Sequence, residues 1–151
     1  MKRTILFSLT LLLVTLLATS CCDCRKRSKL ERPLVGTTWQ LVQIMAHDVT
    51  PDDECYTLQF RSNGTATGKG GCNVFTATFR VSSSRQLTIS NIGATRRLCP
   101  DSEAESAFFD MLDRVTHYEM DADIMILLSN GTLVGMMKAL PADTEPSYLP
   151  L

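Results

Sequence analysis

The sequence predicts an α+β domain, mainly antiparallel β, in which a curled sheet or a partly open small barrel carries one helix. Three observations lead to this prediction. Several short segments alternate apolar and polar residues, as half-buried strands do. Two Asn-Gly pairs stand between such segments, where tight hairpin turns are expected. One later segment has apolar residues at helical spacing, so a single helix should pack on the sheet.

The predicted strands follow one another through short turns. Asn63-Gly64 and Asn130-Gly131 supply the positive φ angles of tight hairpins. In the first strand the alternation slips around Leu41-Val42, so a bulge is expected there. We expect strands at residues 37–45, 54–61, 75–81, 87–89, 117–120, 124–128 and 132–139.

The predicted helix begins near Ser102, and its apolar stripe runs from Ala104 to Val115. Ser102 and Glu105 have the spacing of a capping box, and Pro100 comes just before them. The apolar side chains form one stripe, which should face the sheet: Ala104, Ala107, Phe108, Met111, Leu112 and Val115.

The N-terminus has the pattern of an export signal. Met1-Lys2-Arg3 is basic, residues 5–17 are almost entirely apolar, and Ala18-Thr19-Ser20 are small. Residues 1–20 are therefore predicted to be a signal peptide. An uncleaved membrane anchor remains the alternative, although a spanning helix needs roughly 20 apolar residues.

Cys21 follows these small residues directly. Ala18-Thr19-Ser20-Cys21 resembles the lipobox at which lipoprotein signal peptidase cleaves before a lipid-modified cysteine. The resemblance implies a bacterial envelope lipoprotein with fatty acids such as palmitate on Cys21 and its domain in the periplasm or extracytoplasmic space. Ordinary signal peptidase cleavage, with disulfide use of Cys22 and Cys24, remains the alternative.

Charge and composition divide the rest of the chain. Residues 25–32 are basic and lack apolar periodicity, which indicates a flexible tether that could also contact anionic head groups. Nucleic acid is not expected as a partner, because the remaining chain carries more acid than base and the basic run has no aromatic residues. The predicted organisation is a signal peptide at 1–20, the lipidated cysteine and tether at 21–33, one folded domain at 34–140 and a flexible tail at 141–151.

Three ordered blocks of this domain resemble the META or HslJ-like domain family, which includes many envelope lipoproteins. The first block is residues 34–41, Leu-Val-Gly-Thr-Thr-Trp-Gln-Leu. The second is residues 70–75, Gly-Gly-Cys-Asn-Val-Phe, and the third is residues 94–100, Ala-Thr-Arg-Arg-Leu-Cys-Pro. Ala77-Thr78 departs from the family, where a pair containing glycine is more usual. The resemblance implies a β-rich fold with one helix, and it implies no reaction.

The resemblance also guides the cysteine assignment. Six cysteines less a lipidated Cys21 leave five, so one thiol has no partner within the chain. We predict a Cys72–Cys99 disulfide, because both residues lie in the family-like blocks, and Cys55 is the competing partner. A zinc site at these three cysteines is not expected, since no CxxC or nearby pair of histidines accompanies them.

Asn73, Thr95 and Arg96 in these blocks are the candidate binding or structural motif. Gly70-Gly71 should permit backbone angles closed to other residues, which would place Cys72 and Asn73 at a sharp start of the next strand. In the structural interpretation, the Asn73 amide ties down loop backbone. In the functional one, the three residues line one end of the barrel and the Arg96 guanidinium binds a carboxylate or phosphate of a partner.

The sequence predicts no enzyme. It has no nucleophile elbow, HExxH pair, phosphate-binding loop or dinucleotide motif, and we expect no cofactor and no metal. His47 and the acids after it are expected to form a solvated loop. We therefore predict a monomeric envelope module that binds an unknown envelope protein or small ligand, or supports the envelope under stress. An inhibitor or a hydrolase-type enzyme of the cell envelope is the alternative.

Overall fold

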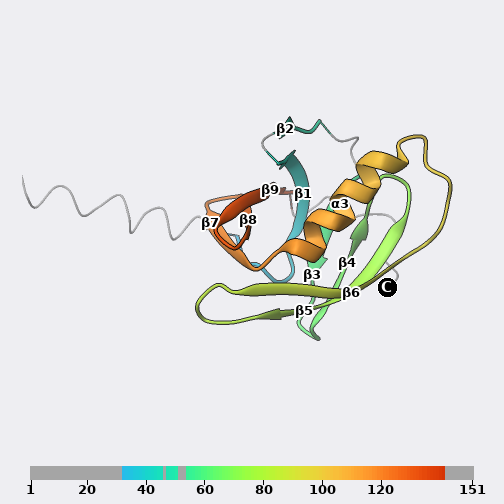
Figure 1. Ribbon diagram of the computed structural model, residues 1–151. Helices are drawn as coiled ribbons and strands as arrows, with labels where there is room; N and C mark the ends of the chain where they lie inside the picture. Colours follow the sequence, from blue (N-terminus) through green and yellow to red (C-terminus); the bar gives the residue numbers. More distant parts are fainter. Residues whose placement is uncertain (1–31, 46, 51–53, 142–151) are drawn as a thin grey trace, which may run out of the picture.

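The computed structural model describes residues 32–45, 47–50 and 54–141 (Figure 1). The predicted signal peptide, Cys21, and most of the tether and tail lie outside these residues. The described residues form nine strands and one helix: β1 Thr38–Ile44, β2 His47–Asp48, β3 Thr57–Phe60, β4 Thr65–Lys69, β5 Val74–Val81, β6 Leu87–Ala94, α3 Ser102–Arg114, β7 His117–Asp121, β8 Ile124–Ser129 and β9 Thr132–Ala139. Helix α3, the one helix of the described residues, is not long and apolar enough to span a membrane.

The strands form one sheet in the order β6-β5-β4-β3-β1-β9-β8-β7, with β2 paired to β1 beside this path. All the paired strands are antiparallel. The predicted fold class, mainly antiparallel β with one helix, is therefore confirmed. The order is that of an open sheet, in which β6 and β7 are the two edges.

The two edge strands meet at one place only among the described residues. An isolated bridge joins Gln86, which directly precedes β6, to His117, the first residue of β7. Backbone hydrogen bonds run from Leu87 N to Thr116 O (2.9 Å) and from Tyr118 N to Arg85 O (3.0 Å). These bonds hold the start of β6 and the turn before it to the start of β7 and the residue before it.

The turns follow the sequence prediction in one hairpin and depart from it in the other. Asn130 and Gly131 have φ values of 49° and 83°, as the predicted tight turn requires. In the earlier turn only Gly64 has a positive φ, at 83°. Asn63 instead accepts hydrogen bonds through Oδ1 from Thr65 N (3.1 Å) and Thr65 Oγ1 (2.6 Å). The prediction of two positive φ angles is therefore wrong at Asn63.

Strand β1 contains the predicted bulge. Its register against β9 shifts between Leu41 and Gln43, while Trp39 and Leu41 on the same face are buried. The shift accounts for the loss of alternation at Leu41-Val42, because the extra residue disturbs the period of two.

Helix α3 lies across one face of the sheet and contacts β6 and β9 (Figure 1). Phe108, Met111 and Leu112 are buried, and Val115 at its C-cap is 2% exposed, which confirms the predicted apolar stripe. The Phe108 ring packs edge-on against Tyr56 and Phe75 at centroid distances of 5.5 and 6.0 Å. The helix thus closes the core over β5, β6 and β9.

The N-terminus of α3 differs from the prediction. Asp101 is the N-cap, and its Oδ1 accepts a hydrogen bond from Ala104 N at 2.9 Å. Ser102 is the first helical residue, and the Glu105 side chain turns away from the cap toward the loop before β5. The predicted capping box of Ser102 and Glu105 is therefore wrong, because Asp101 caps the helix and Glu105 accepts its hydrogen bonds from the loop.

Candidate binding site

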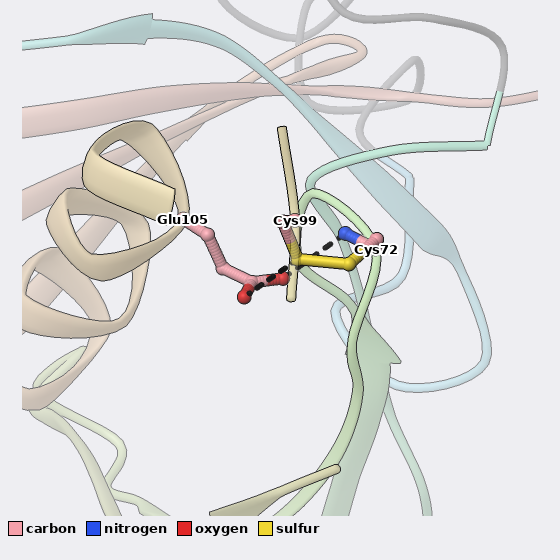
Figure 2. Close-up of side chains that lie close together, drawn as sticks. All are labelled: Cys72, Cys99 and Glu105. Carbon is pink, nitrogen blue, oxygen red and sulfur yellow. Dashed lines mark hydrogen bonds between the residues drawn. A yellow bond between two sulfur atoms is a disulfide. The ribbon is translucent and has the colours of Figure 1, made fainter. Parts of the chain in front are cut away.

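Two loops and the first turn of α3 meet at one end of the sheet (Figure 2). The first loop, Gly70 to Asn73, joins β4 to β5, and the second joins β6 to α3. Cys72 and Cys99 link the loops in a disulfide with a Cα–Cα distance of 5.7 Å. The predicted Cys72–Cys99 pairing is confirmed.

Glu105 fixes the first loop to the helix. Its Oε1 accepts hydrogen bonds from the backbone N–H groups of Cys72 (3.0 Å) and Asn73 (2.9 Å). Its Oε2 accepts a third from the Asn73 side-chain amide at 2.6 Å. Glu105 is only 7% exposed, so these bonds satisfy a carboxylate that is largely removed from water.

The same contacts set the protonation of Glu105. Burial on its own raises the pKa of this carboxyl group, but the hydrogen bonds from the Asn73 side chain and from the Asn73, Cys72 and Gly71 backbone outweigh it. The pKa of Glu105 therefore lies below its ordinary value of 4.5. At neutral pH the site contains a buried carboxylate anion held by neutral donors.

The disulfide lies against this carboxylate. Cys99 Sγ is 3.2 Å from Glu105 Oε2, and since the oxidised sulfur carries no hydrogen, this is a close contact rather than a hydrogen bond (Figure 2). The two sulfurs and the carboxylate lie within 4.8 Å of one another. The thiolate is the metal-binding form of cysteine, so this group offers no thiolate ligand while the disulfide is intact.

Gly70 and Gly71 matter because they have no side chain. A Cβ atom on Gly70 would lie 2.7 Å from Glu105 Oε1 and 3.0 Å from Phe109 Cζ. A Cβ atom on Gly71 would lie 3.3 Å from the Tyr56 hydroxyl. Neither glycine has a positive φ, so the prediction that they supply special backbone angles is wrong. They allow the helix to approach the loop closely.

Asn73 fixes the second loop. Its Oδ1 accepts hydrogen bonds from Arg97 N (2.7 Å) and Thr95 Oγ1 (2.8 Å), and its Nδ2 donates to Arg97 O (3.1 Å). The side chain is 4% exposed. Asn73 therefore binds both backbone groups of Arg97, as the structural interpretation of this residue predicts. We call residues 95–99, fixed in this way and by the disulfide, the clamped loop.

The structure brings together two of the three motif residues. Asn73 and Thr95 are in direct contact, whereas Arg96 is exposed and its guanidinium makes no hydrogen bond or ion pair within the described part of the chain. Sequence reasoning missed the role of Glu105, which it assigned to the helix cap. The sequence does carry a signal for its burial, since Glu105 precedes Phe108 by three residues and Leu112 by seven and so lies on the apolar stripe.

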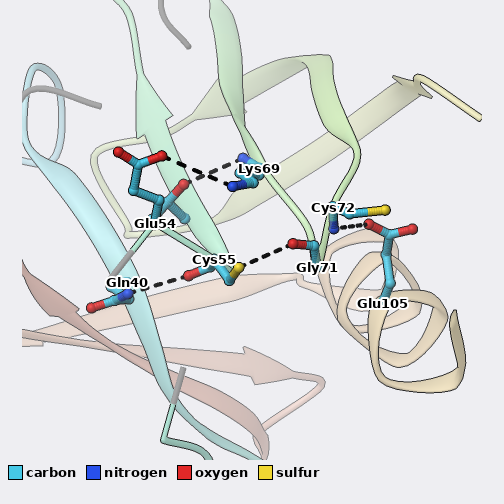
Figure 3. Close-up of polar contacts among 8 residues, drawn as sticks. Gln40, Glu54, Cys55, Lys69, Gly71, Cys72 and Glu105 are labelled. Carbon is cyan, nitrogen blue, oxygen red and sulfur yellow. Dashed lines mark hydrogen bonds and ion pairs between the residues drawn. The ribbon is translucent and has the colours of Figure 1, made fainter. Parts of the chain in front are cut away.

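Cys55 lies on the other side of the first loop and is the free cysteine of the described residues (Figure 3). Its Sγ donates to Gly71 O at 3.0 Å, and its carbonyl accepts from Gln40 Nε2 at 3.3 Å. Next to it, Lys69 Nζ and Glu54 Oε2 are 3.9 Å apart. Cys55 thus supports the loop through a polar contact and is not the partner of Cys72.

Comparisons with known proteins agree with this architecture. The family model of the META domain matches residues 32–139. An NMR structure of a protein from Burkholderia xenovorans is similar, with 22% identity and a TM-score of 0.54 over 71% of this chain and 83% of that one. The crystal structure of a DUF4847 family protein from Bacteroides vulgatus is also similar, with 16% identity and a TM-score of 0.53 over 70% of this chain and 93% of that one.

At these identities the solved structures support the fold alone. No curated protein matches this chain. The family match spans most of the sequence and includes both loops of the site, the disulfide and Glu105. The chain belongs to the META domain family.

Proposed function

We propose that this META domain protein is a lipid-anchored module of the bacterial cell envelope that acts by binding and not by catalysis. The binding would serve an envelope protein or small ligand, or support the envelope under stress. The proposal rests on the hydrogen bonds that the polar side chains of the site make within the protein. Glu105 and Asn73 bind each other, the first loop and Arg97, rather than open solvent.

A catalytic acid, base or nucleophile must reach the proton or carbon atom that reacts. Both oxygens of Glu105 and both polar atoms of the Asn73 amide are already bound within the protein. Among the described residues, every buried side-chain nitrogen and oxygen atom has a partner. The network is therefore suited to hold loops in place, and the exposed side chains of the clamped loop are left to meet a partner.

The anchor is supported by the sequence. The basic n-region, the apolar segment and the small residues before Cys21 fit a lipoprotein signal, and membership of the META domain family is compatible with it. Residue 32, where the described domain begins, is bound to the domain, since Arg32 N donates to Ala122 O at 3.0 Å. Only the segment from Cys21 to residue 31 would then separate the lipid from this contact.

Labelling with radioactive palmitate tests the anchor. We expect the full chain expressed in bacteria to take up label and to sediment with membranes. Cys21→Ser should abolish both, whereas the matched changes Cys22→Ser and Cys24→Ser should leave both unchanged. Label that persists in Cys21→Ser would overturn the lipoprotein assignment.

Turnover tests the non-enzymatic part of the proposal. Purified full chain should convert none of the substrates of a hydrolase panel that covers esters, peptides, glycosides and phosphate esters. Measurable hydrolysis that disappears in Arg96→Ala, with folding unchanged, would establish the enzyme alternative instead.

A further inference from the structure

We infer that the clamped loop is a docking surface, at which Arg96, Arg97 and Leu98 bind an acidic segment of a protein partner. The inference rests on the proposed function, because it names the chemistry of the partner for that binding role. The clamped loop has a backbone that is fixed at several points and three exposed side chains, those of Arg96, Arg97 and Leu98.

The backbone of the loop is fixed at three of its five residues. Thr95 N donates to Val74 O at 3.0 Å, and Arg97 is held through both its N–H and its carbonyl by Asn73. Cys99 is bonded to Cys72. A loop whose backbone is already held in one conformation loses little backbone entropy when it binds, which favours affinity for a partner.

Leu98 is the most exposed large apolar side chain of the described residues. It is 102% exposed, compared with 56% for Met45, the next in order. Single exposed leucines are common on proteins. This one, however, lies between Arg97, which is hydrogen-bonded to Asn73, and Cys99, which is bonded to Cys72. Burial of the Leu98 side chain in an apolar pocket of a partner would stabilise the complex, because apolar surface would be removed from water.

Two arginines accompany this leucine. Arg96 and Arg97 are exposed, and no ion pair to either guanidinium occurs within residues 32–45, 47–50 and 54–141. Arginine is enriched at protein interfaces, and its planar group binds carboxylates through two parallel hydrogen bonds. The loop therefore offers one apolar contact flanked by two cations, which complements an acidic segment with a hollow for Leu98.

The position of the loop favours a protein over the membrane to which the chain would be anchored. The first residue of β5, Val74, pairs with Lys69, the last residue of β4. The clamped loop lies beside Val74, since Thr95 N donates to Val74 O. Gly36 N donates to Phe60 O at the opposite end of the neighbouring strand β3. The first described residues of the domain thus lie at one end of the sheet, and the clamped loop lies at the other end (Figure 1).

Neighbouring charges favour the same conclusion. Asp101 and Glu103 are exposed on the helix turn that follows the loop, so the surface is not uniformly basic. A protein partner can place acidic groups opposite Arg96 and Arg97 and keep them away from Asp101 and Glu103, which an anionic membrane or polymer of uniform charge cannot do. An acidic protein segment is therefore the partner that the residues fit.

Site-specific photocrosslinking in cells tests the inference. A benzoylphenylalanine is placed at position 98 of the full chain, and a matched control carries it at Ser83, an exposed residue in the turn between β5 and β6. We expect position 98, and not position 83, to crosslink to one protein, at a peptide rich in Asp and Glu. Arg96→Glu with Arg97→Glu should reduce that crosslink by at least about tenfold, because two attractive pairs become repulsive.

Each other outcome would overturn the inference. These outcomes are crosslinks to lipid, crosslinks to a second copy of this chain, equal crosslinking at positions 98 and 83, no crosslink at position 98, and a yield that charge reversal leaves unchanged. Palmitate labelling of the same cells separates the two proposals. Labelled chain without the position 98 crosslink would refute the docking surface and leave the anchored module standing, whereas unlabelled chain would refute the anchor.

Discussion

Glu105 and Asn73 form the contact on which the site depends. The carboxylate accepts from two backbone N–H groups and from the Asn73 amide, and the same amide binds Arg97. An apolar residue at position 105 would continue the stripe of α3 but would leave the buried N–H group of Asn73 and the partly buried N–H group of Cys72 without this acceptor. Unpaired buried donors cost about 1 to 3 kcal/mol each, so the polar residue is the more stable choice here.

Replacement of this carboxylate should make stability depend less on pH. Glu105→Gln should lower the free energy of unfolding by about 1.5 to 3 kcal/mol at neutral pH, because charge-assisted hydrogen bonds are lost. The pKa of Glu105 is lowered in the folded state from 4.5. Its contribution is therefore complete above 4.5 and is lost as pH falls through the lower folded pKa.

The difference in free energy of unfolding between wild type and Glu105→Gln should therefore become smaller as the pH is lowered below 4.5. Urea unfolding at several pH values measures this difference. Glu103→Gln is the matched control, because Glu103 lies in the same helix turn and is exposed. A constant gap across this range, or an equal effect of Glu103→Gln, would contradict the role given to Glu105.

At the scale of elements, the sequence predicts most of this fold. The strands with clear alternation and the helix with its stripe are found at nearly the predicted residues, because burial of one face imposes a period that the sequence displays. Strand β4, Thr65–Lys69, was not among the predicted strands. Its buried positions are Ala66 and Gly68, which are too small to give an apolar signal.

Close packing explains the composition of β4. A Cβ atom on Gly68 would collide with Thr57 O and lie 2.7 Å from Phe75 Cε1. Close contacts of this kind cannot be predicted from the local sequence, because Gly68 and Thr57 come together only when β3 and β4 pair in the sheet. The link between Glu105 and Asn73 is hidden for the same reason, because the residues are 32 positions apart.

The start of α3 provides a test at this scale. Asp101→Ala should destabilise the protein by about 1 kcal/mol, because Ala104 N loses its acceptor. Ser102→Ala should change stability by less than about 0.5 kcal/mol, since Ser102 is exposed and is not the cap. Thermal unfolding of both variants would distinguish the observed cap from a capping box, which requires the larger loss in Ser102→Ala.

For the whole molecule, the disulfide joins segments that are distant in the chain. Cys72 and Cys99 are separated by 27 residues, and the loop between them includes β5 and β6. Loss of such a link allows the unfolded chain more conformations. The double variant Cys72→Ala, Cys99→Ala should therefore lose about 3 to 4 kcal/mol of stability.

Denaturant unfolding under oxidising conditions measures this loss. Cys55→Ala is the matched control, because Cys55 contacts the same loop without being bonded to another cysteine. A loss as large in Cys55→Ala as in the double variant would contradict the assignment of the stabilising link to Cys72 and Cys99.

Glu105, Asn73 and the disulfide together hold residues 95–99 in one conformation, so that the exposed side chains of this loop can bind a partner. Hydrogen exchange of the Arg97 amide tests this most directly, because this N–H donates to Asn73 Oδ1. Leu98 N, which makes no hydrogen bond within the described residues, is the internal reference. We expect the Arg97 amide to exchange slowly and the Leu98 amide to exchange fast. In Asn73→Ala the Arg97 amide should exchange as fast as that of Leu98, while the amides of the core strands stay protected. Equally fast exchange of both amides in the wild type would show that the loop is not clamped.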